Sequence, residues 1–175
     1  MLVHRSDIDR RETRFAVRLL RDQIGQKVHT VHRLDKPTSG LLLFALNTED
    51  ASRLSVDFQE RKINKKYSAL VRGFMPEEGC IDYAYALRYD PLDAATHDQS
   101  RKTAAVTHYR CAQQFEVQIP LGRYPSARFS LLELKPETGR KHQLRRHMKH
   151  LSHPIAGDTT YGAVSYTHLT LPTKA

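Results

Sequence analysis

The spacing of apolar residues predicts two amphipathic helices in the first third of the chain. From Asp9 onward, apolar residues recur every three or four positions, and Gly25 lies where a helix C-terminus favours glycine, so we expect a helix that ends there. Residues 47–63 predict a second helix, in which Asn47 or Thr48 caps the N-terminus and acidic residues occupy the first turn.

Five further segments predict four strands and a loop. Residues 41–46, "LLLFAL", form a short continuous apolar run, which is typical of a strand covered on both faces and predicts a central position in a sheet. Later segments rich in aromatic and β-branched residues predict successive antiparallel strands at 65–73, 103–115 and 127–135. The polar stretch 88–102 lacks periodicity and contains a proline, so we expect a loop. Helices and strands mixed without a steady alternation favour the α+β class.

Residues 135–158 combine a predicted helix with a concentration of positive charge. Thr138 is suited to cap this helix, and an apolar stripe runs along it at Leu144, Met148 and Leu151. The remaining polar positions are almost all cationic: Arg140, Lys141, Arg145, Arg146, Lys149 and His150. Cations at a helix start oppose the helix dipole, so we expect an anion to neutralise them. A solvated basic face is the alternative.

Composition limits the kind of protein. With 175 residues, of which 39% are hydrophobic and 27% charged, the chain is typical of one globular unit. A net charge of +9 makes nucleic acid the favoured partner and an anionic membrane surface a weaker one. No apolar run reaches the roughly 20 residues of a membrane span, and the N-terminus has no secretory signal. We therefore expect a cytoplasmic protein without a membrane anchor.

Two polar clusters are open to a chemical interpretation. Four histidines lie within 142–153, but they have no HExxH motif, cysteine partner or acidic residue between them, so they predict no metal site. Asp35 precedes the turn formers of "PTSG", so we expect it in a tight loop that enters the 41–46 strand. The carboxylate there either caps the loop as an Asx-turn or performs chemistry, and the local pattern alone favours the cap.

Three longer motifs occur in the order found in a known family. "HRLDKPTSG" at 32–40 resembles the HRLDxxTSG signature of the RluA-type pseudouridine synthases. "KKYSALVRG" at 65–73 resembles their tyrosine motif, and "TGRKHQLRRH" at 138–147 resembles their second, arginine-containing motif. The resemblance implies a partial catalytic domain over residues 1–162, with a mixed, largely antiparallel sheet, flanking helices and a central cleft. Within the family, the likeness is greatest to members that modify uridine-65 of tRNA, and ribosomal RNA is the alternative substrate.

The resemblance also implies roles for single residues. It makes Asp35 the catalytic carboxylate, Tyr67 the residue against the target base, and Arg140 the partner of Asp35. Arg33 would occupy or support the place of the flipped nucleotide. The expected RNA contacts, mainly to phosphates, are His32, Arg33, Lys65, Lys66, Lys141, Leu144, Arg145, Arg146 and Lys149.

The reaction of this family breaks the bond from ribose to a uracil nitrogen and rejoins the base through carbon. It needs no redox change, so the resemblance implies no metal and no organic cofactor, and we infer a monomer without an obligate protein partner. Family segments before "LVHRS" and after Gly162 have no counterpart here, so a noncatalytic RNA-binding fragment is one rival interpretation and a histidine-dependent metal nuclease another. Residues 163–175 match no family segment, and we interpret them as a non-native tail.

Overall fold

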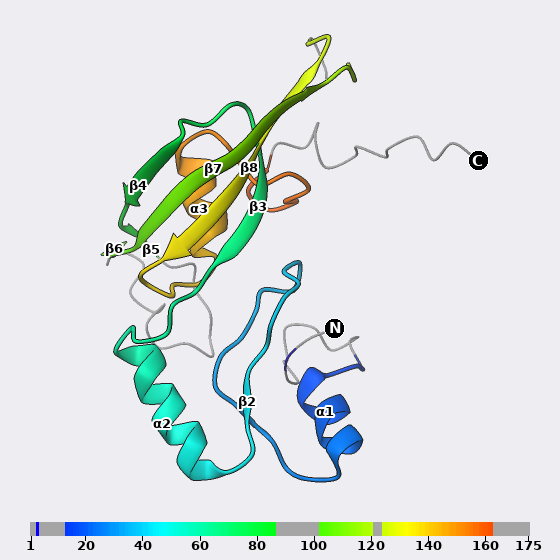
Figure 1. Cartoon of the computed structure of the whole chain (residues 1–175), viewed down its shortest axis with the longest axis vertical. Coiled ribbons are helices and arrows are strands. Elements are labelled where there is room, and N and C mark those ends of the chain that lie inside the picture. The colour runs from blue at the N-terminus through cyan, green and yellow to red at the C-terminus, as the bar shows by residue number, and fades with distance from the viewer. Residues whose placement is uncertain (1–2, 4–12, 87–101, 121–123, 163–175) are drawn as a thin grey trace, which may run out of the picture. The chain divides into compact units, whose positions relative to one another are not determined.

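The computed structural model describes residues 3, 13–86, 102–120 and 124–162. The elements along them, shown in Figure 1, are α1 (Ala16–Ile24), β1 (His29–Thr30), β2 (Phe44–Ala45), α2 (Thr48–Gln59), β3 (Tyr67–Arg72), β4 (Glu78–Asp82), β5 (Tyr85–Ala86), β6 (Lys102–Thr103), β7 (Val106–Val117), β8 (Ala127–Pro136) and α3 (Gln143–His150). The expected loop at 88–102 lies outside the described residues, except for Lys102 in β6.

The chain divides into two compact units, an N-terminal unit, Met1–Ile63, and a C-terminal unit, Asn64–Ala175. The length of the chain predicted a single folded unit. Among the described strands, however, β1 pairs only with β2, and no strand of the N-terminal unit joins the sheets of the C-terminal unit. Each unit therefore satisfies its strand hydrogen bonds within itself, and each is described separately below.

Both predicted helices of the N-terminal unit are present. Gly25 terminates α1 in the left-handed conformation, at φ 71°, and its amide donates to the carbonyl of Arg21, as the sequence predicted. The start differs, because residues 13–15 precede the helix and Phe15 is extended. Asn47 caps α2 by accepting a hydrogen bond from the Asp50 amide at 2.7 Å, which confirms the predicted cap.

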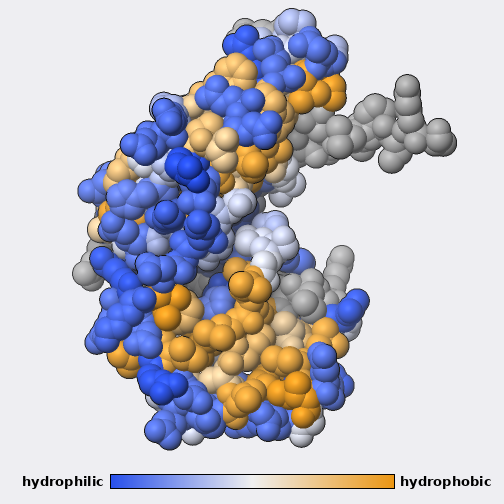
Figure 2. Space-filling view, in the orientation of Figure 1, coloured by the Kyte–Doolittle hydropathy of each residue, from blue (hydrophilic) through white to orange (hydrophobic). Residues whose placement is uncertain are grey.

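The prediction of a central, doubly covered strand at 41–46 is wrong. Only Phe44 and Ala45 of this segment are in strand conformation, and among the described strands they pair with β1 alone, in a two-stranded sheet. Leu41 is 95% exposed. Figure 2 shows apolar side chains gathered on the surface of this unit. An apolar run indicates that a segment favours burial, but the sequence of the run does not specify which strands lie beside it.

The C-terminal unit contains an antiparallel sheet in the order β3-β8-β7-β4. The strands expected at 65–73, 103–115 and 127–135 correspond to β3, β7 and β8, whereas β4 and β5 were not predicted. α3 packs on one face of this sheet (Figure 1), where Met148 is fully buried against Leu132 and Leu134. The α+β class is therefore confirmed, and this core fixes the elements that carry or flank the candidate site residues of the C-terminal unit.

Candidate active site

Asp35 begins a hydrogen-bonded turn in the N-terminal unit. The Thr38 amide donates to the Asp35 carbonyl at 2.8 Å, so residues 35–38 form the tight turn that the sequence predicted. Gly40 follows with φ 142°, in a region of backbone conformation that residues other than glycine rarely adopt. Asp35 is half-buried, so the turn holds a carboxylate at the surface on a constrained backbone.

His32 anchors this turn to its surroundings. Its Nε2 accepts a hydrogen bond from the Leu43 amide at 2.9 Å, and its ring stacks on Phe58 of α2 with centroids 5.0 Å apart. Because Nε2 accepts, the ring proton of neutral His32 lies on Nδ1. The sequence predicted His32 only as an RNA contact, whereas these interactions give it a structural role between β2 and α2. Arg33 beside it is exposed.

Arg140 lies in a short loop that Gln143 organises. The Gln143 side-chain oxygen accepts from the Thr138 hydroxyl at 2.7 Å and from the Arg140 amide at 3.0 Å. Its side-chain nitrogen donates to the carbonyl of Val106 and the hydroxyl of Thr107, both at 2.9 Å. Gln143 is 5% exposed and uses all its donors and acceptors within the fold. The sequence argument gave Gln143 no role, because a glutamine inside a basic motif does not stand out.

The predicted N-cap of α3 is wrong. Thr138 is buried, and its hydroxyl is engaged by Gln143 and by the amide of Val106, so it belongs to the link between β8 and β7. α3 begins at Gln143 after His142, which has φ 56° and makes no side-chain cap. Arg140 and Lys141 therefore precede the helix instead of forming its first turn. The apolar stripe is confirmed, since Leu144 and Leu151 pack around buried Met148.

Tyr67 and two lysines lie at the start of β3. Tyr67 is opposite Leu134 of β8, and its half-buried ring packs against the main hydrophobic cluster. A side-chain carbon added at Gly139 would lie 3.6 Å from the Lys65 amine, so Lys65 reaches the loop that carries Arg140. Lys66 pairs with Glu133 at 3.0 Å and, with Lys135, holds the pKa of that carboxyl below its usual range. Tyr67 and Arg140 belong to the C-terminal unit and Asp35 to the N-terminal unit, so their common role stays a prediction.

Arg145 forms a buried ion pair with Asp158. Its Nε and one terminal nitrogen donate to the two Asp158 carboxylate oxygens at 2.7 and 2.8 Å. The side chain of Arg145 is only 12% exposed and that of Asp158 only 4%. Burial raises the pKa of Asp158, but hydrogen bonds from Arg145 and from the amides of Tyr161 and Thr160 outweigh it and lower the pKa to about 2. The charge of Arg145 is therefore largely neutralised within the protein.

A cavity of about 300 Å³ in the C-terminal unit is lined by aromatic and cationic side chains. These are Tyr83, Tyr85, Arg146, Lys149, His150 and Tyr161. The sequence argument named Arg146, Lys149 and His150 but missed the three tyrosines. The alternation in "DYAYA" at 82–86 was an available signal, because residues two apart on an extended segment share a face.

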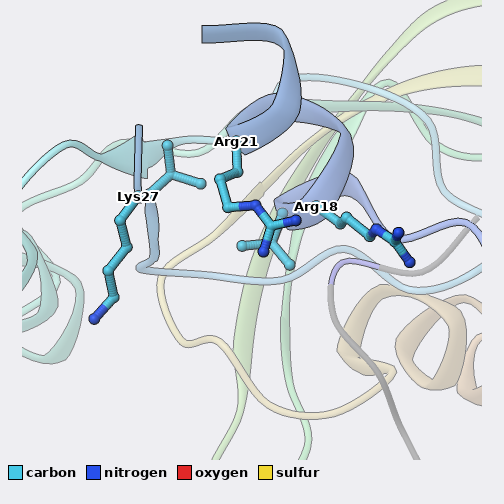
Figure 3. Close-up of a pocket in the computed structure, with 5 residues that line it drawn as sticks. Arg18, Arg21 and Lys27 are labelled. Atoms are coloured by element: carbon cyan, nitrogen blue, oxygen red, sulfur yellow. The ribbon is translucent and has the colours of Figure 1, made fainter. Parts of the chain in front are cut away.

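The N-terminal unit has a second cavity, of about 410 Å³, beside α1. Its cations are less suited to hold an anion. Arg18 and Arg21 both reach Asp22, at 3.7 and 2.7 Å, and Lys27 extends away from them (Figure 3). Within the described parts of the chain, no three histidine, cysteine or acidic residues are grouped closely enough to hold a metal ion. None of the described helices is long and apolar enough to cross a membrane.

The chain combines an antiparallel sheet that has a basic helix on one face with an aspartate on a hydrogen-bonded turn, and it matches one family of RNA-modifying proteins. Residues 1–150 match the family model described as RNA pseudouridylate synthase, and the chain belongs to this family. Two similar proteins, each named tRNA pseudouridine synthase C, come from Pectobacterium carotovorum and Yersinia pestis. They are 54% and 53% identical to this chain over 162 residues, or 92% of it. The chain spans 43% and 63% of their respective lengths.

The fold agrees with a solved structure. Human RNA Pseudouridylate Synthase Domain Containing 1 superposes with a TM-score of 0.71 at 29% sequence identity. The match covers 94% of this chain and 70% of the human chain. The likeness therefore extends over both units of the chain.

Proposed function

We propose that the protein isomerises a uridine of tRNA, at position 65, to pseudouridine. The observation that carries the proposal is Asp35 at the start of a hydrogen-bonded turn, within the motif that resembles the family signature, on a turn that His32 anchors. The names of relatives with more than half of the residues identical favour tRNA over ribosomal RNA as the substrate.

In this proposal each site residue has one task. The Asp35 carboxylate acts as nucleophile or base while the bond from ribose to the uracil nitrogen breaks and a bond to carbon forms. Arg140 is the cation that keeps this carboxylate ionised. Tyr67 offers an aromatic face to the flipped base. Gln143 supports the reaction indirectly, because it shapes the loop of Arg140.

Direct measurement of pseudouridine in tRNA tests the proposal. The purified protein is incubated with a tRNA transcript and with ribosomal RNA, and pseudouridine is located by mass spectrometry after chemical labelling. We expect product in tRNA at position 65. Asp35→Asn should lower turnover by at least about a thousandfold while tRNA binding is largely retained, because only the reacting group is removed.

The matched control is Glu60→Gln, which removes an exposed carboxylate whose one ion pair among the described residues is with Lys62 of the same unit. This variant should turn over like the unaltered protein. Absence of pseudouridine from both RNAs, with this chain and with a chain extended to the length of its relatives, would refute the enzymatic function. Equal activity of Asp35→Asn and the unaltered protein would refute the role of Asp35.

A further inference from the structure

Neighbouring arginines of α3 have opposite electrostatic surroundings. Arg145 is neutralised by Asp158 in a two-pronged ion pair. Arg146 has no carboxylate within 4 Å among the described residues, although its side chain is half-buried. An arginine that is partly removed from water without a counter-charge is costly unless another group neutralises it.

The guanidinium of Arg146 is nevertheless held firmly in place. Its Nε donates to the Tyr161 hydroxyl at 3.1 Å, and one terminal nitrogen donates to the Ala86 carbonyl at 2.7 Å. The guanidinium carbon lies 4.6 Å from the ring centre of Tyr85 and 5.7 Å from that of Tyr161. Within the described parts of the chain, these contacts use two of the five N–H donors and leave the other terminal nitrogen without a hydrogen bond. The group is therefore oriented before any ligand binds.

The cavity around Arg146 has an aromatic floor and a cationic rim. Tyr85 and Tyr161 are 5% and 6% exposed, whereas Lys149 and His150 are exposed one turn further along the helix. Tyr83 and His150 stack nearly parallel, 9° apart, with ring centres 3.6 Å apart. A flat ring from a ligand can extend this stack on the exposed side of His150.

His147 supports the floor without adding charge. It is fully buried, and its ring meets Tyr83 and Tyr85 edge-on, with centroids 6.3 and 5.9 Å away. Burial lowers the pKa of His147, although the nearby backbone of Tyr83 opposes part of this change, and neither ring nitrogen has a hydrogen-bond partner of normal geometry among the described residues. Neutral His147 therefore fixes the tyrosine rings, and the positive charge comes from Arg146, Lys149 and the helix surface.

We propose that this cavity is an accessory RNA-binding subsite that takes one nucleotide, with its phosphate on Arg146 and Lys149 and its base stacked on His150. The residues that line the cavity include neither Asp35 nor Tyr67 nor Arg140, so the proposed subsite uses other residues than the three assigned to the reaction. The proposal rests on the proposed function only in taking RNA as the partner. Cations arranged beside aromatic faces match a nucleotide, because a phosphate needs charge and a base needs a flat apolar surface.

The test measures tRNA binding by fluorescence anisotropy between about 50 and 300 mM salt at pH 8, with Asp35→Asn as the background so that no turnover occurs. Arg146→Gln should weaken binding about tenfold and reduce the slope of log affinity against log salt by about 0.7 to 0.9, the loss of one phosphate contact. His150→Ala should weaken binding about fivefold or more with an unchanged slope, because the lost contact is base stacking and not a phosphate contact.

Two further variants separate position from charge and from misfolding. Arg110→Gln removes an exposed arginine of β7 in the same unit and should leave affinity and slope nearly unchanged. Arg146→Lys keeps the charge but loses the planar donor geometry, so it should retain the slope while affinity falls. Circular dichroism establishes that each variant is folded.

Several results would overturn the subsite. These are equal effects of Arg110→Gln and Arg146→Gln, wild-type affinity of Arg146→Gln, or displacement of tRNA by polyglutamate as readily as by a competing RNA. Failure of the subsite is distinguishable from failure of the proposed function. If the variants of Arg146 and His150 bind tRNA normally and pseudouridine is still formed, only the subsite is refuted. If these variants weaken tRNA binding but no pseudouridine is formed, only the enzymatic function is refuted. Absence of tRNA binding even at low salt refutes both.

Discussion

Replacing Asp158 by asparagine tests the buried ion pair that supports α3. The substitution removes the negative charge but keeps the size of the side chain, so Arg145, only 12% exposed, loses its counter-charge. Breaking one partner of a buried pair costs about 3–5 kcal/mol, and the remaining amide oxygen still accepts from a backbone amide. We therefore expect the free energy of unfolding at pH 7 to fall by about 3 kcal/mol.

The pH dependence follows from the lowered pKa of Asp158. Because its folded-state pKa of about 2 is below the ordinary value of 3.8, the ionised carboxylate stabilises the fold at neutral pH by about 2 kcal/mol. This contribution is fully present above the unfolded-state pKa and is lost as the pH falls from about 4 towards 2. Asp158→Asn cannot titrate, so the stabilities of the two proteins should converge as the pH falls through this window.

Urea unfolding followed by tyrosine fluorescence measures this effect in the relevant unit. All 8 tyrosines lie in the C-terminal unit and the chain has no tryptophan, so the signal reports that unit. Glu78→Gln is the control, because it removes an exposed carboxylate of β4 and should change stability by less than about 0.5 kcal/mol. A loss below about 1 kcal/mol at pH 7, or an equal loss at pH 7 and pH 2.5, would refute the reasoning.

Two further predictions concern the loop of Arg140 and Gly73, a glycine with positive φ. Gln143→Leu should lower the free energy of unfolding by about 3–4 kcal/mol, because it removes the four hydrogen bonds of a buried side chain. The kcat should also fall, because the loop of Arg140 loosens; denaturation and turnover assays check both effects. Gly73→Ala should lower the Tm more than Gly25→Ala does. Both glycines have positive φ, but only the added methyl at Gly73 would meet the His153 ring, 2.7 Å away. Equal decreases in Tm would contradict this prediction.

Much of the fold was predictable because its signals are local. The side chain of Asn47 bonds an amide three residues away, and Gly25 ends α1 through its own backbone freedom, so neither depends on distant residues. The strands β3, β7 and β8 were likewise identified from composition. The placement of the 41–46 segment failed for the opposite reason, since the neighbours of a strand are determined by the whole sheet.

The residues of the candidate site stay a prediction, and most of the contacts that hold them could not be predicted from the sequence. The motif placed Asp35 on a turn, and the turn is present. The motif did not indicate that His32 bonds the Leu43 amide or that Gln143 holds the Arg140 loop, because each contact joins residues that only the fold, or a bend in the chain, brings together. Thr138 shows the same limit: it is a residue type suited to cap a helix, but its hydroxyl accepts from the Val106 amide and so connects the end of β8 to β7.

The basic helix shows why net charge alone does not locate a binding surface. A count of cations treats Arg145 and Arg146 as equivalent, and the sequence argument placed both among the expected RNA contacts. In the structure, Asp158 neutralises Arg145, and the turn that follows carries Tyr161, whose hydroxyl accepts from Arg146. The ion pair of Arg145 with Asp158 therefore helps to position Tyr161, which orients Arg146. The proposed subsite therefore assigns the attraction for RNA in this part of α3 mainly to Arg146 and Lys149, and its geometry depends on the ion pair beside them.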